Sequence, residues 1–144
     1  MNMNNEFDRQ SSFGWLLNVA ANHAAKEFDK RLREKGLTLA LWPTLMCLWE
    51  KEGMTQREIA QMSKVESSTT TRTLDKLEAL DLVERRADPE SRRSFRIFLT
   101  EKGHALKEDV IHLPVEINQD LLSGLEKEEQ RTLIAILQKL VAPL

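Results

Sequence analysis

The feature that most constrains the fold is a change of hydrophobic period after residue 81. Before this point, apolar residues recur at steps of three and four, which is typical of amphipathic helices. After it, residues 82–87 and 95–99 have the composition of short strands. A two-stranded hairpin is marginally stable alone, so these strands must pack against helices. Because Gly (5) and Pro (4) are scarce and Tyr is absent, we expect a mainly α chain with one small hairpin.

The helices in front of the hairpin form a pair. Thr55 and Glu58 fit a capping box at the start of a helix of about eight residues. A three-residue break at 63–65 precedes a second helix near 66–80, which keeps three leucines for the interior: Leu74, Leu77 and Leu80. Two helices joined by a tight turn are a helix-turn-helix. With the hairpin behind it, the pattern predicts a winged helix-turn-helix.

Two helices are predicted upstream of this pair. The first covers residues 11–35 and stops at Gly36, a residue that commonly ends helices. The second ends at Gly53 and holds Pro43 in its first turn, where the missing N–H of proline is not needed.

Two more helices are predicted downstream of the hairpin. One runs from about residue 100 to 122 and is interrupted or bent near Pro114. The last covers residues 125–141 and opens with a second capping box from Ser123 to Glu126.

The terminal helices are long and amphipathic, and a chain of 144 residues has few other elements to cover them. The simplest solution is a partner copy, so the sequence predicts a C2 homodimer in which helices 11–35 and 101–143 intertwine. The expected organisation is one compact unit of three segments. These are an N-terminal dimerisation helix (1–36), a winged DNA-binding lobe (37–100) and C-terminal dimerisation helices (101–144).

The second helix of the pair carries the strongest candidate binding surface. At about 100° per residue, one polar face holds four side chains: Thr69, Arg72, Thr73 and Lys76. Ser67 and Ser68 lie at the helix N-terminus, where free amides and the helix dipole favour phosphate. Short hydroxyls permit close approach to DNA, and an arginine can bind a guanine edge with two hydrogen bonds. The alternative is a solvated helix with hydroxyl caps.

A local basic patch follows, although the net charge of the chain is −2. It consists of five arginines: Arg85, Arg86, Arg92, Arg93 and Arg96. Arg92 and Arg93 are neighbours in the hairpin loop, and arginine suits the negative potential of a narrow minor groove. The polar helix and the basic hairpin together favour double-stranded DNA as the partner. The alternative is an ordinary charged hairpin tip.

Three short runs carry a family resemblance. RTLDKLE lies in the second helix of the pair, LVERRADPESRR covers the first strand and the loop, and LTEKG follows the second strand. Together with GLTLALWPTL and TQREIA upstream, they resemble the MarR family of bacterial transcription regulators over about residues 36–104. The combination of the runs, rather than any one of them, is specific to that family.

The resemblance implies a winged-helix homodimer on palindromic DNA, usually a repressor that a small molecule releases. It assigns DNA contacts to five residues: Ser68, Thr69, Arg72, Arg92 and Arg93. One position departs from the family, which commonly has Asp directly before the two arginines where this chain has Ser91. The acid that often fixes the wing arginine is absent there, so Asp88 or Glu90 is expected to substitute.

The resemblance also implies a small-molecule site between the dimer helices and the winged lobe, with aromatic carboxylates as the first class to test. Five side chains are candidates to line it: Phe13, Trp15, His23, Trp42 and Met46. For each of them the alternative is plain core packing. No cofactor is expected.

A redox or metal sensor of the same fold is a further alternative. Peroxide-sensing MarR relatives carry their cysteine near the start of the first helix, whereas the single cysteine of this chain, Cys47, lies elsewhere without an adjacent histidine. A structural role is therefore favoured for Cys47. His104, Glu108 and His112 stand at i, i+4 and i+8, and zinc-sensing relatives exist, but no fourth ligand is evident, so no metal is expected.

Two other classes of protein, enzymes and protein-interaction modules, have less support in the sequence. The sequence has no phosphate loop, no G-x-S-x-G motif and no paired carboxylates in a plausible cleft, so an enzyme is not expected. A winged helix used only for protein contacts is disfavoured by three arginines: Arg72, Arg92 and Arg93. No secretory signal or long apolar run is visible, so we expect a soluble, cytoplasmic protein that makes no membrane contact.

Overall fold

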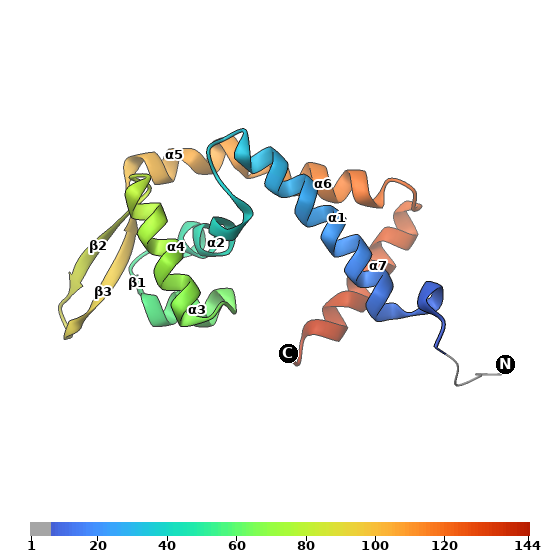
Figure 1. Ribbon diagram of the computed structural model, residues 1–144, viewed down its shortest axis with the longest axis horizontal. Helices are drawn as coiled ribbons and strands as arrows, with labels where there is room; N and C mark the ends of the chain where they lie inside the picture. Colours follow the sequence, from blue (N-terminus) through green and yellow to red (C-terminus); the bar gives the residue numbers. More distant parts are fainter. Residues whose placement is uncertain (1–6) are drawn as a thin grey trace. The chain divides into compact units, whose positions relative to one another are not determined.

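The computed structural model describes residues 7–144, so the first six residues of the expected segment 1–36 lie outside the described residues. The chain divides into two compact units. One consists of residues 29–112 and contains the helix-turn-helix and the hairpin. The other combines the chain up to Phe28 with the chain from Leu113 onward. Figure 1 labels the helices and strands of both units.

The helical part of unit 29–112 is built by α2 (Trp42–Glu50), α3 (Gln56–Ser63), α4 (Ser67–Ala79) and α5 (Glu101–Val110). A 3-10 turn, η2 (Leu39–Leu41), leads into α2, and proline lies in the first turn of that helix as predicted. The side chains that α2, α3 and α4 bury almost completely are Leu45, Leu48, Ile59, Leu74 and Leu77. Each contributes about 1.5–3 kcal/mol by burial, so one shared core holds the three helices together.

The same unit contains an antiparallel sheet of β1 (Met54–Thr55), β2 (Val83–Asp88) and β3 (Ser91–Leu99) in the order β1-β3-β2. The β2–β3 hairpin, here called the wing, is longer than the predicted strands because pairing continues as far as Asp88 and Ser91. A bulge between Ala87 and Asp88 shifts its register. Strand β1 was not predicted, because two residues are too few to show an alternating pattern.

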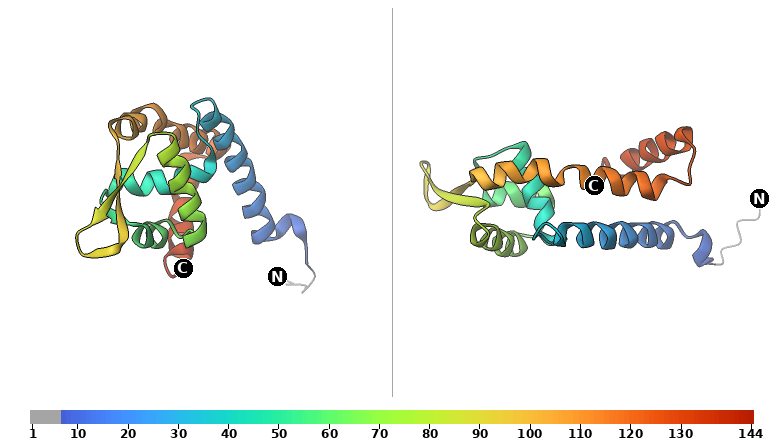
Figure 2. Two further views of the ribbon diagram at one scale, coloured as in Figure 1. Left: turned by 60° about the vertical axis from the view of Figure 1, so that its left-hand side comes forward. Right: turned by 90° about the horizontal axis from the view of Figure 1, so that it is seen from above.

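The succession of α3, a tight turn, α4 and the wing confirms the predicted winged helix-turn-helix and the mainly helical fold class. The wing projects from the helices of its unit, and both views in Figure 2 show its tip extending beyond α3 and α4. Side chains at the tip are therefore presented to the surroundings rather than to the core.

The capping box at the start of α3 is confirmed. The backbone N–H of Glu58 donates to Thr55 Oγ1 at 3.2 Å, and the backbone N–H of Thr55 donates to Glu58 Oε2 at 3.1 Å. The prediction that Leu80 faces the interior was wrong, because 37% of this residue is exposed. Helix α4 ends one residue earlier, and the left-handed Asp81 (φ 59°) turns the chain so that Leu82 enters the core instead.

The other unit contains the first part of α1 (Phe13–Arg33), nearly all of α6 (His112–Leu122) and α7 (Lys127–Val141). The helix predicted from 100 to 122 is two helices, which meet at Ile111 rather than at Pro114. The capping box predicted from Ser123 to Glu126 was also wrong. Glu126 is itself the N-cap of α7, and its backbone N–H donates to Glu129 Oε1 at 3.0 Å.

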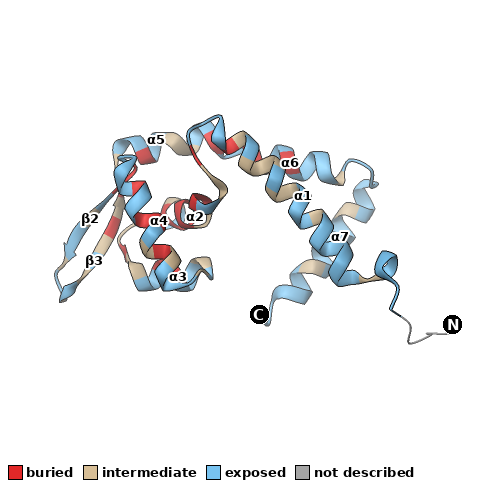
Figure 3. Cartoon of the chain, in the orientation of Figure 1, coloured by how far each residue is buried: buried red, intermediate tan, exposed pale blue. Residues whose placement is uncertain are grey.

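The unit formed by the chain ends has few buried residues, as the pale blue and tan of α1 and α7 in Figure 3 indicate. Among its described residues only Leu113 and Ile117 are buried apolar side chains. Large apolar side chains at least 45% exposed on its helices are Phe13, Leu16, Val19, Val115, Ile134, Ile136, Leu140 and Val141. Within residues 7–144, no helix combines the length and the apolar character needed to cross a membrane.

Candidate nucleic-acid interface

One face of α4 is polar and open. Arg72 and Lys76 are exposed there, Thr69 is half-buried beside them, and Ser67 and Ser68 are exposed at the N-terminal end of the helix. Thr73, which the sequence analysis placed on this face, has only 5% of its surface exposed. The reason is spacing, because the buried side chains of α4 recur at i, i+3, i+4 and i+7: Thr70, Thr73, Leu74 and Leu77. The open face therefore consists of Thr69, Arg72 and Lys76, without Thr73, and the two serines adjoin it at the N-terminal end of the helix.

Side-chain contacts tie α4 to its neighbours. Gln56 at the start of α3 donates its amide N–H to Thr71 Oγ1. Arg85 on β2 reaches back to two carboxylates of α4, with Nη2 2.7 Å from Asp75 Oδ1 and Nη1 3.4 Å from Glu78 Oε1. Because Asp75 and Glu78 are paired with Arg85, they compete less with a partner molecule for the cations of the open face, Arg72 and Lys76.

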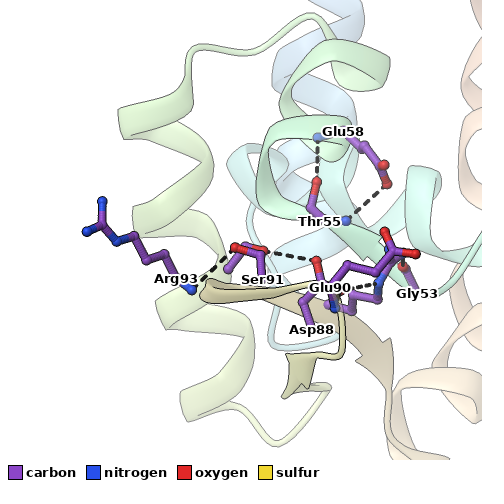
Figure 4. Close-up of polar contacts among 9 residues, drawn as sticks. Gly53, Thr55, Glu58, Asp88, Glu90, Ser91 and Arg93 are labelled. Carbon is purple, nitrogen blue, oxygen red and sulfur yellow. Dashed lines mark hydrogen bonds and ion pairs between the residues drawn. The ribbon is translucent and has the colours of Figure 1, made fainter.

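The wing exposes Arg92 and Arg93 near its tip. Across the described part of the chain, neither guanidinium lies within ion-pair distance of a carboxylate. The backbone N–H of Arg93 donates to Ser91 Oγ at 3.4 Å, and Figure 4 shows the Arg93 side chain pointing away from the other residues drawn. Both cations are therefore available to a partner.

The acids of the wing contact a different arginine from the one expected. Asp88 Oδ1 accepts from Arg96 Nε at 3.2 Å, and Glu90 Oε2 lies 4.0 Å from Arg96 Nη2. Neither acid reaches Arg92 or Arg93, so the expected replacement for the acid missing at Ser91 is not found in the structure. Sequence reasoning missed Arg96 as the partner, because this contact depends on the bulge between Ala87 and Asp88 that shifts the register of the wing.

Hydrogen bonding sets the charge state of Asp88. The backbone N–H of Glu90 donates to it at 3.0 Å, and this bond, the hydroxyl of Ser94 and the guanidinium of Arg96 together hold the pKa of the Asp88 carboxyl below its usual value. Burial acts in the opposite direction on this pKa but is outweighed. Asp88 is therefore an anion that is fully committed to contacts within the wing.

The five residues predicted to line an effector site fall in both units. Phe13, Trp15 and His23 are exposed on α1 in the unit of the chain ends. Trp42 is buried in α2, where its ring meets that of Trp49 edge to face with centroids 5.5 Å apart, and Met46 is 42% exposed on the same helix. The effector site itself stays a prediction.

The predicted sensor residues differ in their surroundings. Cys47 is buried in α2, and burial, followed by the nearby Glu50 carboxylate, raises the pKa of its thiol. His104 Nε2 lies 3.1 Å from Glu52 Oε1. Within residues 7–144, no three His, Cys, Asp or Glu side chains are grouped so that they could hold a metal ion.

Comparison with known proteins identifies the family. The sequence model of the MarR family matches residues 37–95. The organic hydroperoxide resistance transcriptional regulator of Bacillus subtilis (strain 168) is 30% identical over 115 residues, covering 78% of this chain and 78% of that protein. The chain belongs to the MarR family. It is accordingly a transcriptional regulator and not an enzyme, as the sequence predicts.

Solved MarR-type structures share the fold. A MarR transcriptional regulator from Methanosarcina mazei Go1 superposes with a TM-score of 0.83 at 27% identity, covering 90% of this chain and 94% of that one. S. aureus MepR in a complex with DNA superposes with a TM-score of 0.83 at 28% identity, covering 96% of this chain and all of that one. Unit 29–112 contains every residue matched by the MarR family model.

Proposed function

We propose that this MarR-family regulator acts as a homodimer that binds a palindromic operator and represses transcription until a small molecule releases it. The observation that supports DNA binding is that two neighbouring elements, α4 and the wing, both expose cationic side chains. Arg72 and Lys76 lie on the exposed face of α4, and Arg92 and Arg93 lie on the wing that follows α4 in the chain. The similarity of the chain to MepR, which was solved with DNA, supports the same reading.

In this proposal α4 enters the major groove. The hydroxyls of Ser67, Ser68 and Thr69 at its N-terminal end are donors for phosphate, and the first-turn amides add a favourable dipole. Arg72, one turn further, has the reach to bind a guanine edge with two hydrogen bonds. Arg92 and Arg93 contact the backbone and the minor groove, where arginine is favoured by the negative potential.

The homodimer is supported by the unit of the chain ends. Its helices α1 and α7 expose many apolar side chains, among them Phe13, Ile136 and Leu140, and its described residues include only two buried apolar ones. Exposed apolar surface on this scale is typical of subunit contacts. A second copy related by a two-fold axis would cover it and would give the protein the symmetry of a palindromic site.

Repression and release rest on the family relationship. An effector must bind a DNA-incompetent arrangement better than the DNA-bound one, with a coupling of about 1–3 kcal/mol. Aromatic carboxylates are the first class to screen against Phe13, Trp15, His23, Trp42 and Met46. A chain that acts on chromosomal DNA in this way works in the cytoplasm.

The test of DNA binding separates base contacts from backbone contacts. A duplex enriched from a random pool by the full chain is labelled, and its anisotropy is measured beside a scrambled duplex at several salt concentrations. Arg72→Ala is expected to cost about 1–3 kcal/mol per half-site and to reduce the preference for the enriched duplex. Arg93→Ala is expected to weaken both duplexes alike and to make the salt dependence shallower by about one unit for each phosphate that the arginine neutralises.

Arg131→Ala is the matched control, because Arg131 is an exposed arginine on α7 whose ion pair is with Glu128, away from α4 and the wing in the chain. It should leave both affinities unchanged. An operator preference that survives Arg72→Ala but vanishes in Arg93→Ala would reverse the roles of α4 and the wing. Absence of any salt-dependent DNA binding by the unmodified chain would refute the proposed function.

A further inference from the structure

The wing contains a carboxylate that is far less exposed than its surroundings. The side chain of Asp88, at the end of β2, is 6% exposed, whereas that of Glu90, two residues further on, is 86% exposed. Burial of an anion at the edge of a solvent-exposed hairpin is costly unless donors surround it. Asp88 therefore has a role that a surface acid such as Glu90 does not share.

The donors around Asp88 come from the turn and from β3. Its Oδ1 accepts from the backbone N–H of Glu90 at 3.0 Å and from Arg96 Nε at 3.2 Å. Its Oδ2 accepts from the hydroxyl of Ser94 at 3.0 Å. One carboxylate thus closes the turn and joins β2 to β3 on either side of the wing tip, defined here as residues 90–93.

Arg96 extends these contacts to the helix-turn-helix. While Nε binds Asp88, Nη1 donates to the carbonyl oxygen of Gly53 at 2.9 Å. Gly53 is held in turn to β3, since its N–H donates to Ile97 O at 2.8 Å. Two residues after Gly53 comes Thr55, which caps α3, and Figure 4 shows Asp88, Gly53 and the Thr55 capping box close together.

We propose that Asp88 is a positioning residue for DNA binding. Through Arg96 and Gly53 it fixes the wing relative to the segment that starts α3, and through the turn it fixes the backbone that carries Arg92 and Arg93. The proposal rests on the proposed function, because it concerns how the wing cations are presented to DNA. Asp88 itself does not touch DNA, since its oxygens are occupied within the wing.

The direction in which Asp88→Asn changes the affinity for DNA distinguishes a positioning role from a purely electrostatic one. Asp88→Asn removes a negative charge near a surface that binds a polyanion, and charge alone would make DNA binding tighter. Positioning predicts weaker binding, because the amide is a poorer acceptor for Arg96 and the backbone N–H. Glu90→Gln makes the same change in charge at the same turn without those buried contacts, and is the matched control.

The measurement is the anisotropy titration of the full chain on the enriched duplex at one salt concentration. Glu90→Gln should bind as well as the unmodified chain or more tightly. Asp88→Asn should bind about fivefold to tenfold more weakly, the net size expected for the loss of one ordinary hydrogen bond. Arg96→Lys should weaken binding in the same direction, because it keeps the charge but cannot reach both partners, and it serves as the test if Asp88→Asn fails to fold.

A double-mutant cycle decides whether Asp88 acts through the wing cations. With Arg92→Ala and Arg93→Ala already present, Asp88→Asn should cause no further loss of affinity. The inference is overturned if Asp88→Asn binds like Glu90→Gln, or if its full effect persists without the two arginines. A chain that enriches no duplex at all overturns the proposed function and this inference together, an outcome distinct from the other two.

Discussion

At the scale of single residues, Cys47 is the only thiol of the chain and it is well protected. Its side chain lies in the core beside Leu45 and Leu48 on α2, with 3% of the residue exposed. Burial and the Glu50 carboxylate raise the pKa of the thiol, so little reactive thiolate forms near neutral pH. The B. subtilis relative is named for organic hydroperoxide resistance, but this chain has no exposed cysteine with which to sense a peroxide.

Native Cys47 should therefore react with Ellman's reagent at least about tenfold more slowly than an exposed thiol, and should react fully only in denaturant. The comparison is the double variant Met46→Cys, Cys47→Ala. It moves the thiol by one position onto the side of α2 where Met46 is 42% exposed. Equal rates for the two thiols would contradict the protected state and would revive the redox alternative.

Predictions about the exposure of single residues were correct where the chemistry of the side chain alone decides whether it is exposed. Arg72 and Lys76 on α4 are exposed as expected, because a cation is rarely buried without a partner. Thr73 was misplaced because a threonine fits either a core or a surface. The contact of Asp88 with Arg96 could not be foreseen, since it depends on the bulge that sets which residues face each other across the wing.

At the scale of elements, the junction between α4, the wing and α5 depends on Gly103. A Cβ atom at this position would lie 2.1 Å from the carbonyl oxygen of Leu82, and Trp49 Nε1 donates to the Gly103 carbonyl at 3.0 Å. The hydroxyl of Thr100 accepts from the Gly103 N–H at 3.0 Å and completes the cap of α5. Helix α5 therefore approaches the chain before β2 too closely for any side chain.

Gly103→Ala should lower the free energy of unfolding by about 1–3 kcal/mol or more, because the backbone must move to relieve the clash. Helix propensity alone predicts the opposite, since alanine is favoured over glycine by about 1 kcal/mol within a helix. The measurement is urea unfolding followed by circular dichroism. Gly124→Ala is the control, because nothing lies within 4 Å of a Cβ there, and equal midpoints for the two variants would refute the packing argument.

Element boundaries were predictable wherever a local signal marks them. The cap at Thr55 begins α3, and Gly36 with φ of 77° follows the end of α1, where the sequence indicates. Helix α2, in contrast, ends at Glu50 and not at Gly53. Strand β1 was not predictable, because its hydrogen bonds join it to residues 96–97, far along the chain. The extended pairing of β3 was not predictable either, because it continues past a bulge into a charged loop that has no strand pattern. The start of α7 was misjudged because glutamate, rather than serine, acts as its cap.

At the scale of the whole molecule, the exposed apolar surface of α1 and α7 makes the oligomeric state the critical property. Sedimentation at micromolar concentration should give about twice the chain mass of 16.6 kDa. Ile136→Glu should shift the protein toward the monomer and weaken DNA binding. It places a charge on the exposed apolar surface of α7, where Ile136 itself is 57% exposed.

Gln138→Glu adds the same charge two residues further along α7, on a different side of the helix, and should leave the dimer intact. A folded monomer that binds the enriched duplex as tightly as a dimer would exclude the proposed assembly. If both glutamate variants dissociate alike, charge repulsion rather than disruption of an apolar interface would be the cause.

The way the wing is fastened also bears on how such a regulator could diversify. The side chains that anchor it belong to Asp88, Ser94 and Arg96, with the Gly53 carbonyl as a further partner, and all lie outside the wing tip (residues 90–93). The tip itself contributes only the backbone N–H of Glu90. Mutations of side chains at the tip therefore leave these contacts in place, so duplicated genes could drift there and change how strongly each descendant holds DNA while each keeps a rigid wing. The residues free to change at the wing tip are thus different from the residues that hold the wing in place.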